Sequence, residues 1–251
     1  MSSIPVSSPA SELPPLSEGA RLVDTFIAPS KTFTDLRRSA MWWAPFLLII
    51  VIQVFLAAVV DKQVGYRKVV ENQIQMSPKA VDRMERMPPE QREQILKQQT
   101  AGTRIFWYVF PVALLILDVI FAALYFGTFR LGFNADLKYK TALAVVVYAS
   151  LPYALKSLVA GLFLLAGVNT DTFIFQNPIA SNPGYFLSAA DSPFLYGIAS
   201  AVDVFALWSI ILTGIGFAYA GRIKKSTAIG TVLAWYVIVT LFFSGLGAAF
   251  S

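Results

Sequence analysis

The 251-residue chain contains no cysteine and no histidine. Their absence excludes disulfides, thiol nucleophiles, metal sites of the Cys/His type and histidine general bases. Charged residues are also scarce, at 14% of the sequence, and the net charge of +5 is modest. We therefore identify no catalytic, cofactor-binding or metal-ligating residue, expect no cofactor, and do not expect nucleic acid as a partner.

Hydrophobic residues, in contrast, make up 56% of the chain, and the mean hydropathy is +0.61. They form five runs with at most one charge in each, and each run is long enough for a helix to cross the roughly 30 Å hydrocarbon core of a bilayer. The sequence therefore predicts an all-α, polytopic transmembrane bundle of five helices within residues 41–251. The expected spans cover residues 41–60, 105–129, 142–167, 194–220 and 228–250.

The first 40 residues divide into two parts. Residues 1–18 are rich in serine and proline and lack the pattern of a signal peptide, so we expect a disordered cytoplasmic tail. Residues 19–40 have the pattern of amphipathic helices that lie on the membrane surface, with a short soluble linker as the alternative. The apolar side is formed by Phe26, Ile27, Phe33 and Leu36, and the polar side carries Arg21, Lys31, Arg37 and Arg38.

The basic residues of the short loops set the expected orientation. Lysine and arginine are common before the first span, between the second and third, and between the fourth and fifth, whereas residues 168–193 contain neither. This asymmetry predicts an inner N-terminus and an outer C-terminus. Residues 61–104 then form an extracytoplasmic helical insert. Its nine basic residues argue the other way, but they are spread among six acidic ones, so the short loops decide more.

Three charged residues interrupt the apolar runs: Asp118, Lys156 and Asp203. Counted from the expected inner ends of the spans, each aspartate lies ~4.5 Å in depth from the lysine, so a packed bundle can hold one cation between two carboxylates. An unpaired charge inside the bilayer is costly, and pairing is therefore expected. The cluster is either a structural ion pair that fixes the helix register or part of an ion or proton path.

The third run also contains Pro152. Proline removes the backbone hydrogen bond to the carbonyl group of Tyr148 and is expected to kink the helix, while the hydroxyl group of Ser150 could satisfy the freed group. Such a kink beside Lys156 either shapes a cavity or is a packing feature of the bundle.

Several of these segments together resemble a known family. Residues 27–37 (IAPSKTFTDLR), followed by the Trp-Trp-x-Pro start of the first span, are similar to the N-terminal signature of bacterial Yip-domain proteins, the Ypt/Rab-interacting-protein family. Residues 148–152 (YASLP) resemble the tyrosine-to-proline motif of that family, and residues 203–208 (DVFALW) resemble its fourth span. The resemblance extends over residues 20–250 of this sequence.

The resemblance implies five transmembrane helices, a cytoplasmic N-terminus and no catalytic centre. Eukaryotic members of the family bind prenylated Rab GTPases, but this chain lacks their tail motif Asp-Leu-Tyr-Gly-Pro, so Rab binding is not expected here. The polar insert suits a bacterial member. The expected location is therefore the bacterial inner membrane, with the eukaryotic Golgi or endoplasmic reticulum membrane as the alternative.

Three functions are compatible with these features. The first is a membrane scaffold or adaptor without catalytic activity, with the lipid bilayer and membrane or cytoplasmic proteins as partners; a homo-oligomer is also compatible with the sequence. The second is a small transporter or channel that uses Asp118, Lys156 and Asp203. An intramembrane enzyme ranks third among these functions, because no sequence motif pairs a nucleophile with a general base. The resemblance and the N-terminal amphipathic pattern favour the scaffold.

Overall fold

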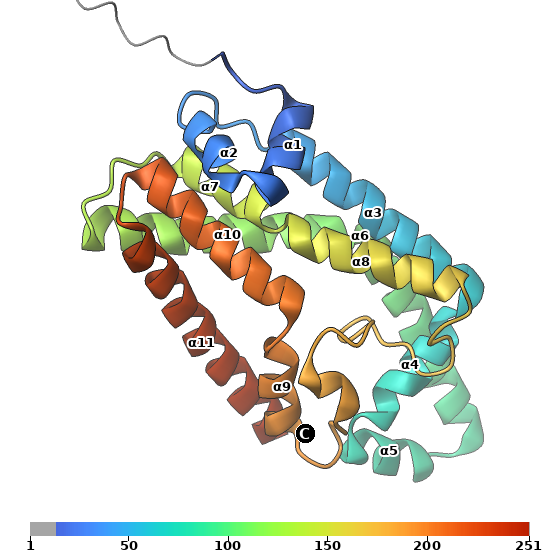
Figure 1. The fold of residues 1–251 in the computed structure, drawn as a ribbon. Helices are drawn as coiled ribbons and strands as arrows, with labels where there is room; N and C mark the ends of the chain where they lie inside the picture. Colours follow the sequence, from blue (N-terminus) through green and yellow to red (C-terminus); the bar gives the residue numbers. More distant parts are fainter. Residues whose placement is uncertain (1–13, 251) are drawn as a thin grey trace, which may run out of the picture.

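The computed structural model describes residues 14–250 (Figure 1), so most of the expected tail, residues 1–18, lies outside the described residues. Within the described part the chain forms helices and loops but no β-strand. Five helical stretches are long and apolar enough to cross a membrane, which confirms the predicted all-α bundle of five spans. The chain begins with α1 (Glu18–Ile27) and α2 (Pro29–Asp35), and the spans lie in α3 (Trp43–Gln63), α6 (Pro89–Gly127), α7 with α8 (Tyr139–Ala149 and Leu151–Leu165), α10 (Val204–Gly221) and α11 (Lys225–Phe250).

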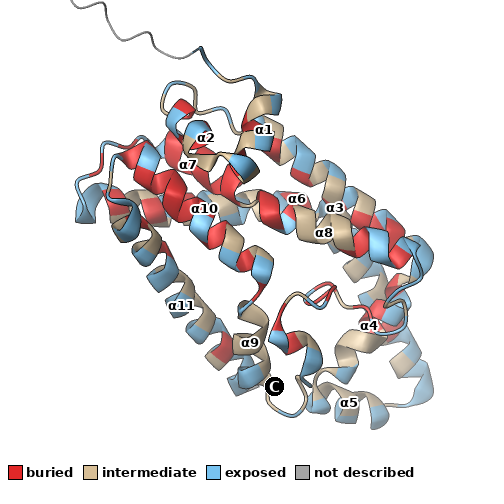
Figure 2. Ribbon diagram, viewed as in Figure 1, coloured by how far each residue is buried: buried red, intermediate tan, exposed pale blue. Residues whose placement is uncertain are grey.

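Helix α7 lies at the centre of the bundle, because all nine residues from 141 to 149 are buried. Helix α10 is also largely buried and packs against α7, whereas α6 and α11 turn many apolar side chains outward (Figure 2). In a bilayer these outward side chains face lipid tails that are equally apolar, so their exposure is not penalised. The third and fourth spans therefore form the core.

Two glycines of α10 let other helices approach its backbone closely. A Cβ atom on Gly214 would lie 2.6 Å from the Cα atom of Ile229 in α11, and one on Gly216 would collide with the side chain of Val145 in α7. The ring of Phe33 in α2 also comes within 3.1 Å of this second position. Larger residues here would push α2, α7 or α11 away from α10.

The third span consists of two helices rather than one kinked helix, because α7 and α8 meet at Ser150. Pro152 lies in the first turn of α8, where a helix does not need the missing N–H group. The hydroxyl group of Ser150 donates to the carbonyl group of Val147 at 2.9 Å, one residue before the acceptor expected at Tyr148. At the predicted kink the structure thus has a one-residue break between two helices, and Ser150 itself keeps helical backbone dihedrals.

The fourth apolar run, predicted as one span over residues 194–220, is also divided. It contains α9 (Pro193–Ala201) and α10, and of these two only α10 is long enough to span a membrane. The physical reason is Asp203, whose side chain accepts hydrogen bonds from the N–H groups of Phe205 and Ala206 and so begins a new helix. Asp203 therefore lies at a helix start and not inside a continuous helix.

The predicted insert is helical in the structure. Helix α6 has 39 residues and is about 58 Å long, so its first part, residues 89–104, extends ~24 Å beyond the apolar part. The side chain of Asn72 donates to the carbonyl groups of Asp171 and Phe173, both at 3.0 Å, which joins the insert to the loop between the third and fourth spans. Both lie at the end of the bundle opposite α1 and α2 (Figure 1). The insert's own helices are α4 (Tyr66–Gln75) and α5 (Pro78–Glu85).

Cysteine labelling can test the predicted orientation, because the chain contains no cysteine of its own. Single cysteines at the exposed positions Lys79 and Asp171 are expected to react with a membrane-impermeant maleimide added to intact cells, and one at the exposed position Lys224 is not. All three should react once the membrane is opened, which controls for accessibility. Labelling at Lys224 in intact cells, without labelling at Asp171, would show that the orientation is inverted.

Candidate functional site

Helices α1 and α2 are packed onto the bundle with their apolar side. Phe33 and Leu36 are completely buried, and Phe26 packs edge-on against Trp208 of α10, with the ring centroids 5.3 Å apart. Ile27 alone of the four predicted apolar-side residues is exposed, at 75%. The expectation that this apolar side lies in the membrane surface is therefore wrong for Phe33 and Leu36, because the protein itself covers them. The surface location of the segment as a whole stays a prediction.

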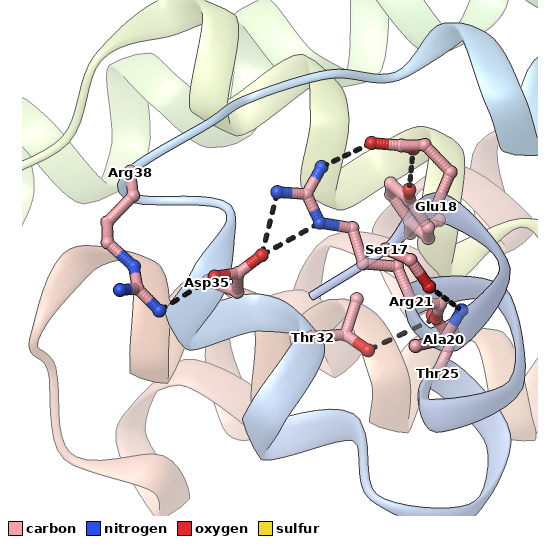
Figure 3. Close-up of polar contacts among 9 residues, drawn as sticks. Ser17, Glu18, Ala20, Arg21, Thr25, Thr32, Asp35 and Arg38 are labelled. Atoms are coloured by element: carbon pink, nitrogen blue, oxygen red, sulfur yellow. Dashed lines mark hydrogen bonds and ion pairs between the residues drawn. The ribbon is translucent and has the colours of Figure 1, made fainter. Parts of the chain in front are cut away.

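Arg21, expected on the polar side, is instead buried, with 2% of its side chain exposed. Two carboxylates, one from the start of α1 and one from the end of α2, hold it (Figure 3). Its Nε and Nη2 atoms contact Oδ2 of Asp35 at 2.8 and 2.7 Å, and its Nη1 atom donates to Oε1 of Glu18 at 2.7 Å. The amphipathic pattern misleads here because it assigns charge to the solvent side, whereas a charge with well-placed partners can be buried.

Further contacts join Arg21 to the bundle. The hydroxyl group of Tyr148 in α7 donates to Oε2 of Glu18 at 3.0 Å, and Asp35 also accepts from Arg38 at 2.9 Å. Burial acts to lower the pKa of the Arg21 guanidinium, but the hydrogen bond to Asp35 and the nearby negative charges outweigh it, and the pKa is raised above its ordinary value. We call the five residues of this cluster the N-terminal network: Glu18, Arg21, Asp35, Arg38 and Tyr148.

A second polar site joins two of the three charges predicted inside the membrane. Nζ of Lys156 in α8 donates to Oδ2 of Asp203 at 2.8 Å, and the two side chains are 14% and 4% exposed. Asp118 is half-buried in α6, and it forms no ion pair with another described residue. The structure thus brings Lys156 and Asp203 together and leaves Asp118 apart.

The carboxylate of Asp203 is saturated with donors. Besides the lysine, Oδ2 accepts from the hydroxyl group of Ser181 and from the amide of Asn182 at 3.1 Å, while Oδ1 accepts from the N–H groups of Phe205 at 2.9 Å and Ala206 at 3.2 Å. Ser181 and Asn182 belong to the loop between the third and fourth spans, so this loop covers the break in the fourth span. Five hydrogen bonds occupy all the lone-pair sites of a carboxylate.

Both polar sites consist of charged side chains whose partners come from within the protein. Among residues 14–250 no group of three or more potential metal-ligating side chains lies together. Both sites instead act as clamps: the N-terminal network holds α1 and α2 against α7, and the Lys156–Asp203 pair holds α8 to the start of α10. Their contribution is to fix the positions of helices.

Sequence reasoning missed several members of these sites, namely Glu18, Asp35, Ser181 and Asn182. A usable signal existed for Glu18, because it precedes Arg21 by three positions, which is the spacing of a helical ion pair. Asp35 lies beyond a helix break, and Ser181 and Asn182 lie in a loop without periodicity, so no sequence pattern connects these residues with their partners.

Comparison with known proteins gives one positive result. The sequence model of the Yip1 domain matches residues 23–246. No significant match was found among curated proteins or among solved structures. The matched range contains all the residues that form the two polar sites except Glu18 and Arg21, and it confirms the resemblance noted in the sequence. Because the match covers most of the chain, the protein belongs to the Yip1 domain family.

Proposed function

We propose that this Yip1-domain membrane protein acts as a scaffold or adaptor without catalytic activity. The observation that carries the proposal is the N-terminal network, which fixes α1 and α2 as a rigid platform at one end of the bundle (Figure 3). In a flexible linker such ion pairs would be exposed to water. The entropy lost when two exposed side chains are ordered offsets most of the attraction between them, so the ion pairs would stabilise a linker only slightly. We place the protein in the bacterial inner membrane, with the Golgi or endoplasmic reticulum membrane of a eukaryote as the alternative.

The platform carries an apolar ridge, which we define as Val23 and Ile27 of α1. Their side chains are 57% and 75% exposed, and their spacing of four positions places them on one helix face. An exposed apolar patch next to a membrane contacts either lipid or another protein. We assign the ridge to a protein partner in or on the membrane, because Phe33 and Leu36, which would anchor the segment in lipid, are already buried in the bundle.

Photo-crosslinking in intact membranes tests this assignment. A photoreactive amino acid at Ile27 is expected to give protein adducts of discrete mass, because the ridge would lie against its partner. The same amino acid at Leu131, which is 87% exposed in the segment after α6, is the matched control and should give none of these adducts. Adducts with lipid alone at Ile27, or the same adducts at both positions, would contradict the adaptor proposal.

A small transporter or channel is the second candidate, and Asp118 is the observation that favours it. A half-buried carboxylate within a span, with no ion pair to another described residue, is typical of an ion or proton path. Two features favour the scaffold instead: Asp203 already accepts from five donors, and neither Lys156 nor Asp203 lines either of the two cavities described for residues 14–250. The transporter hypothesis requires an ion flux in proteoliposomes that Asp118→Asn abolishes.

A further inference from the structure

A cavity of about 540 Å³ opens at the end of the bundle that carries α1 and α2. Three stretches that are distant in the sequence form it: the end of α2 with the turn after it, the segment before α7, and the end of α10. Figure 1 shows these stretches side by side at one corner of the molecule. The lining side chains that matter here are Arg37, Arg38, Asp136, Lys138, Thr141 and Arg222.

The cavity lies at the depth where the spans leave the hydrocarbon core. Lys138 directly precedes the third span, which begins at Tyr139, and Arg222 directly follows α10, which ends at Gly221. The headgroup layer of a bilayer extends only ~5–7 Å beyond each side of the hydrocarbon core, and the lipid phosphates lie within it. The basic residues of the cavity are therefore at the level of lipid phosphate groups.

The cavity carries an excess of positive charge, because four cations and one carboxylate line it. Arg37 contacts Asp136 at 3.5 Å, and this aspartate is 77% exposed, so the contact offsets little of the charge. Arg38 is held by the N-terminal network. Neither Lys138 nor Arg222 forms an ion pair with another described residue, so both cations are available to an external anion.

The backbone adds to this positive potential. Helix α7 starts after Lys138, and the side chain of that residue does not cap it. Aligned peptide dipoles place about half a positive charge at a helix start, and phosphate groups bind there through the N–H groups of the first turn. Thr141, whose side chain has a hydroxyl donor, also lines the cavity.

We propose that this cavity binds the headgroup phosphate of an anionic phospholipid, held chiefly by Lys138 and Arg222. A phosphate diester offers the charged acceptor oxygens that ammonium, guanidinium and backbone N–H groups require. A lipid fits better than a soluble phosphate, because the cavity opens at the border of the spans and the acyl chains can continue into the hydrocarbon layer. The inference goes beyond the scaffold function, since it does not depend on any protein partner.

The test uses the whole 251-residue chain in a neutral maltoside detergent, with phosphatidylglycerol as the probe. Phosphatidylglycerol is expected to raise the Tm in a saturable way, and phosphatidylcholine, which has no net charge, is not. The double variant Lys138→Gln/Arg222→Gln should weaken the apparent affinity about thirtyfold, because each basic residue next to an anionic headgroup contributes a factor of about five. Both side chains are exposed, so the variant should keep the fold and the Tm measured without lipid.

The matched control is Lys224→Gln/Lys225→Gln, which removes the same charge close to Arg222 from exposed residues that do not line the cavity. This control should keep the wild-type affinity, whereas an equal loss in both double variants would mean that only diffuse charge attraction is at work. A wild-type affinity of Lys138→Gln/Arg222→Gln would overturn the proposal. So would a full stabilisation by inorganic phosphate alone, because the cavity would then be a site for soluble phosphate.

Discussion

Replacing Asp35 with asparagine is expected to lower the free energy of unfolding by ~3–5 kcal/mol. Arg21 and Asp35 are 2% and 3% exposed, and the substitution leaves the guanidinium group with one of its two carboxylates in a site that water does not reach. Equilibrium unfolding in mixed micelles should compare Asp35→Asn, Arg21→Met and the double variant. The double variant should lose less than the sum of the two single losses, because each single variant leaves a buried charge with incomplete partners.

The pair of Arg37 and Asp136 provides a matched control. It joins the same two residue types in the same part of the molecule, but the contact is 3.5 Å long and Asp136 is 77% exposed. Arg37→Met and Asp136→Asn should each change the free energy of unfolding by less than ~1 kcal/mol, with little coupling between them. If Asp35→Asn lowers the free energy of unfolding no more than Asp136→Asn does, the N-terminal network does not fix α1 and α2. The rigid platform would then no longer support the scaffold proposal.

Substitutions in the Lys156–Asp203 pair are also expected to lower the free energy of unfolding strongly. The loss should be larger for the aspartate than for the lysine. Asp203→Asn should cost ~3–5 kcal/mol of unfolding free energy, because the ammonium group of Lys156 is left without an anion. Lys156→Met should cost less, ~1.5–3 kcal/mol, because Asp203 keeps its four other donors. Asparagine is also a good N-cap, so the start of α10 is preserved. Equilibrium unfolding of both single variants and the double variant measures the coupling.

Asp118→Asn is the matched control for this second cycle, because it removes a carboxylate from a span without breaking an ion pair of the described residues. Its effect should simply add to that of Lys156→Met. A coupling between Lys156 and Asp118 as large as that between Lys156 and Asp203 would contradict the pairing in the structure. It would also strengthen the transporter hypothesis, in which the lysine and both aspartates form one path.

The five spans could be predicted from the sequence, because the thickness of a bilayer demands about 20 apolar residues per helix and five runs meet that demand. The break in the fourth run could not, since the residues on both sides of Asp203 are apolar. The break depends on tertiary partners: Lys156 comes from the third span and Ser181 from the following loop. Their contacts favour Asp203 at a helix start over Asp203 in a helix interior.

The polar sites show the same limit. The depth of the charges in the bilayer left two aspartates as candidate partners of Lys156. Depth contains no information on how a helix is rotated about its axis, so only the packed bundle shows that Asp203 is the partner. Helical periodicity likewise placed Phe33 and Leu36 on one side without showing what that side contacts. The contact surface exists because α10 has a glycine at position 216, which leaves room for the ring of Phe33.

Phe33 is synthesised long before the surface that buries it. That surface includes Val145 and Gly216, so α2 cannot complete its docking until the fourth span has left the ribosome. At ~5–20 residues per second, the roughly 180 residues from Phe33 to Gly216 take about 10–40 s to make. During this interval Phe33 and Leu36 are uncovered and can be recognised by chaperones or proteases. Closure of the N-terminal segment onto the bundle therefore marks a chain whose first four spans have been made, and in a protein truncated before α10 the side chain of Phe33 would stay uncovered.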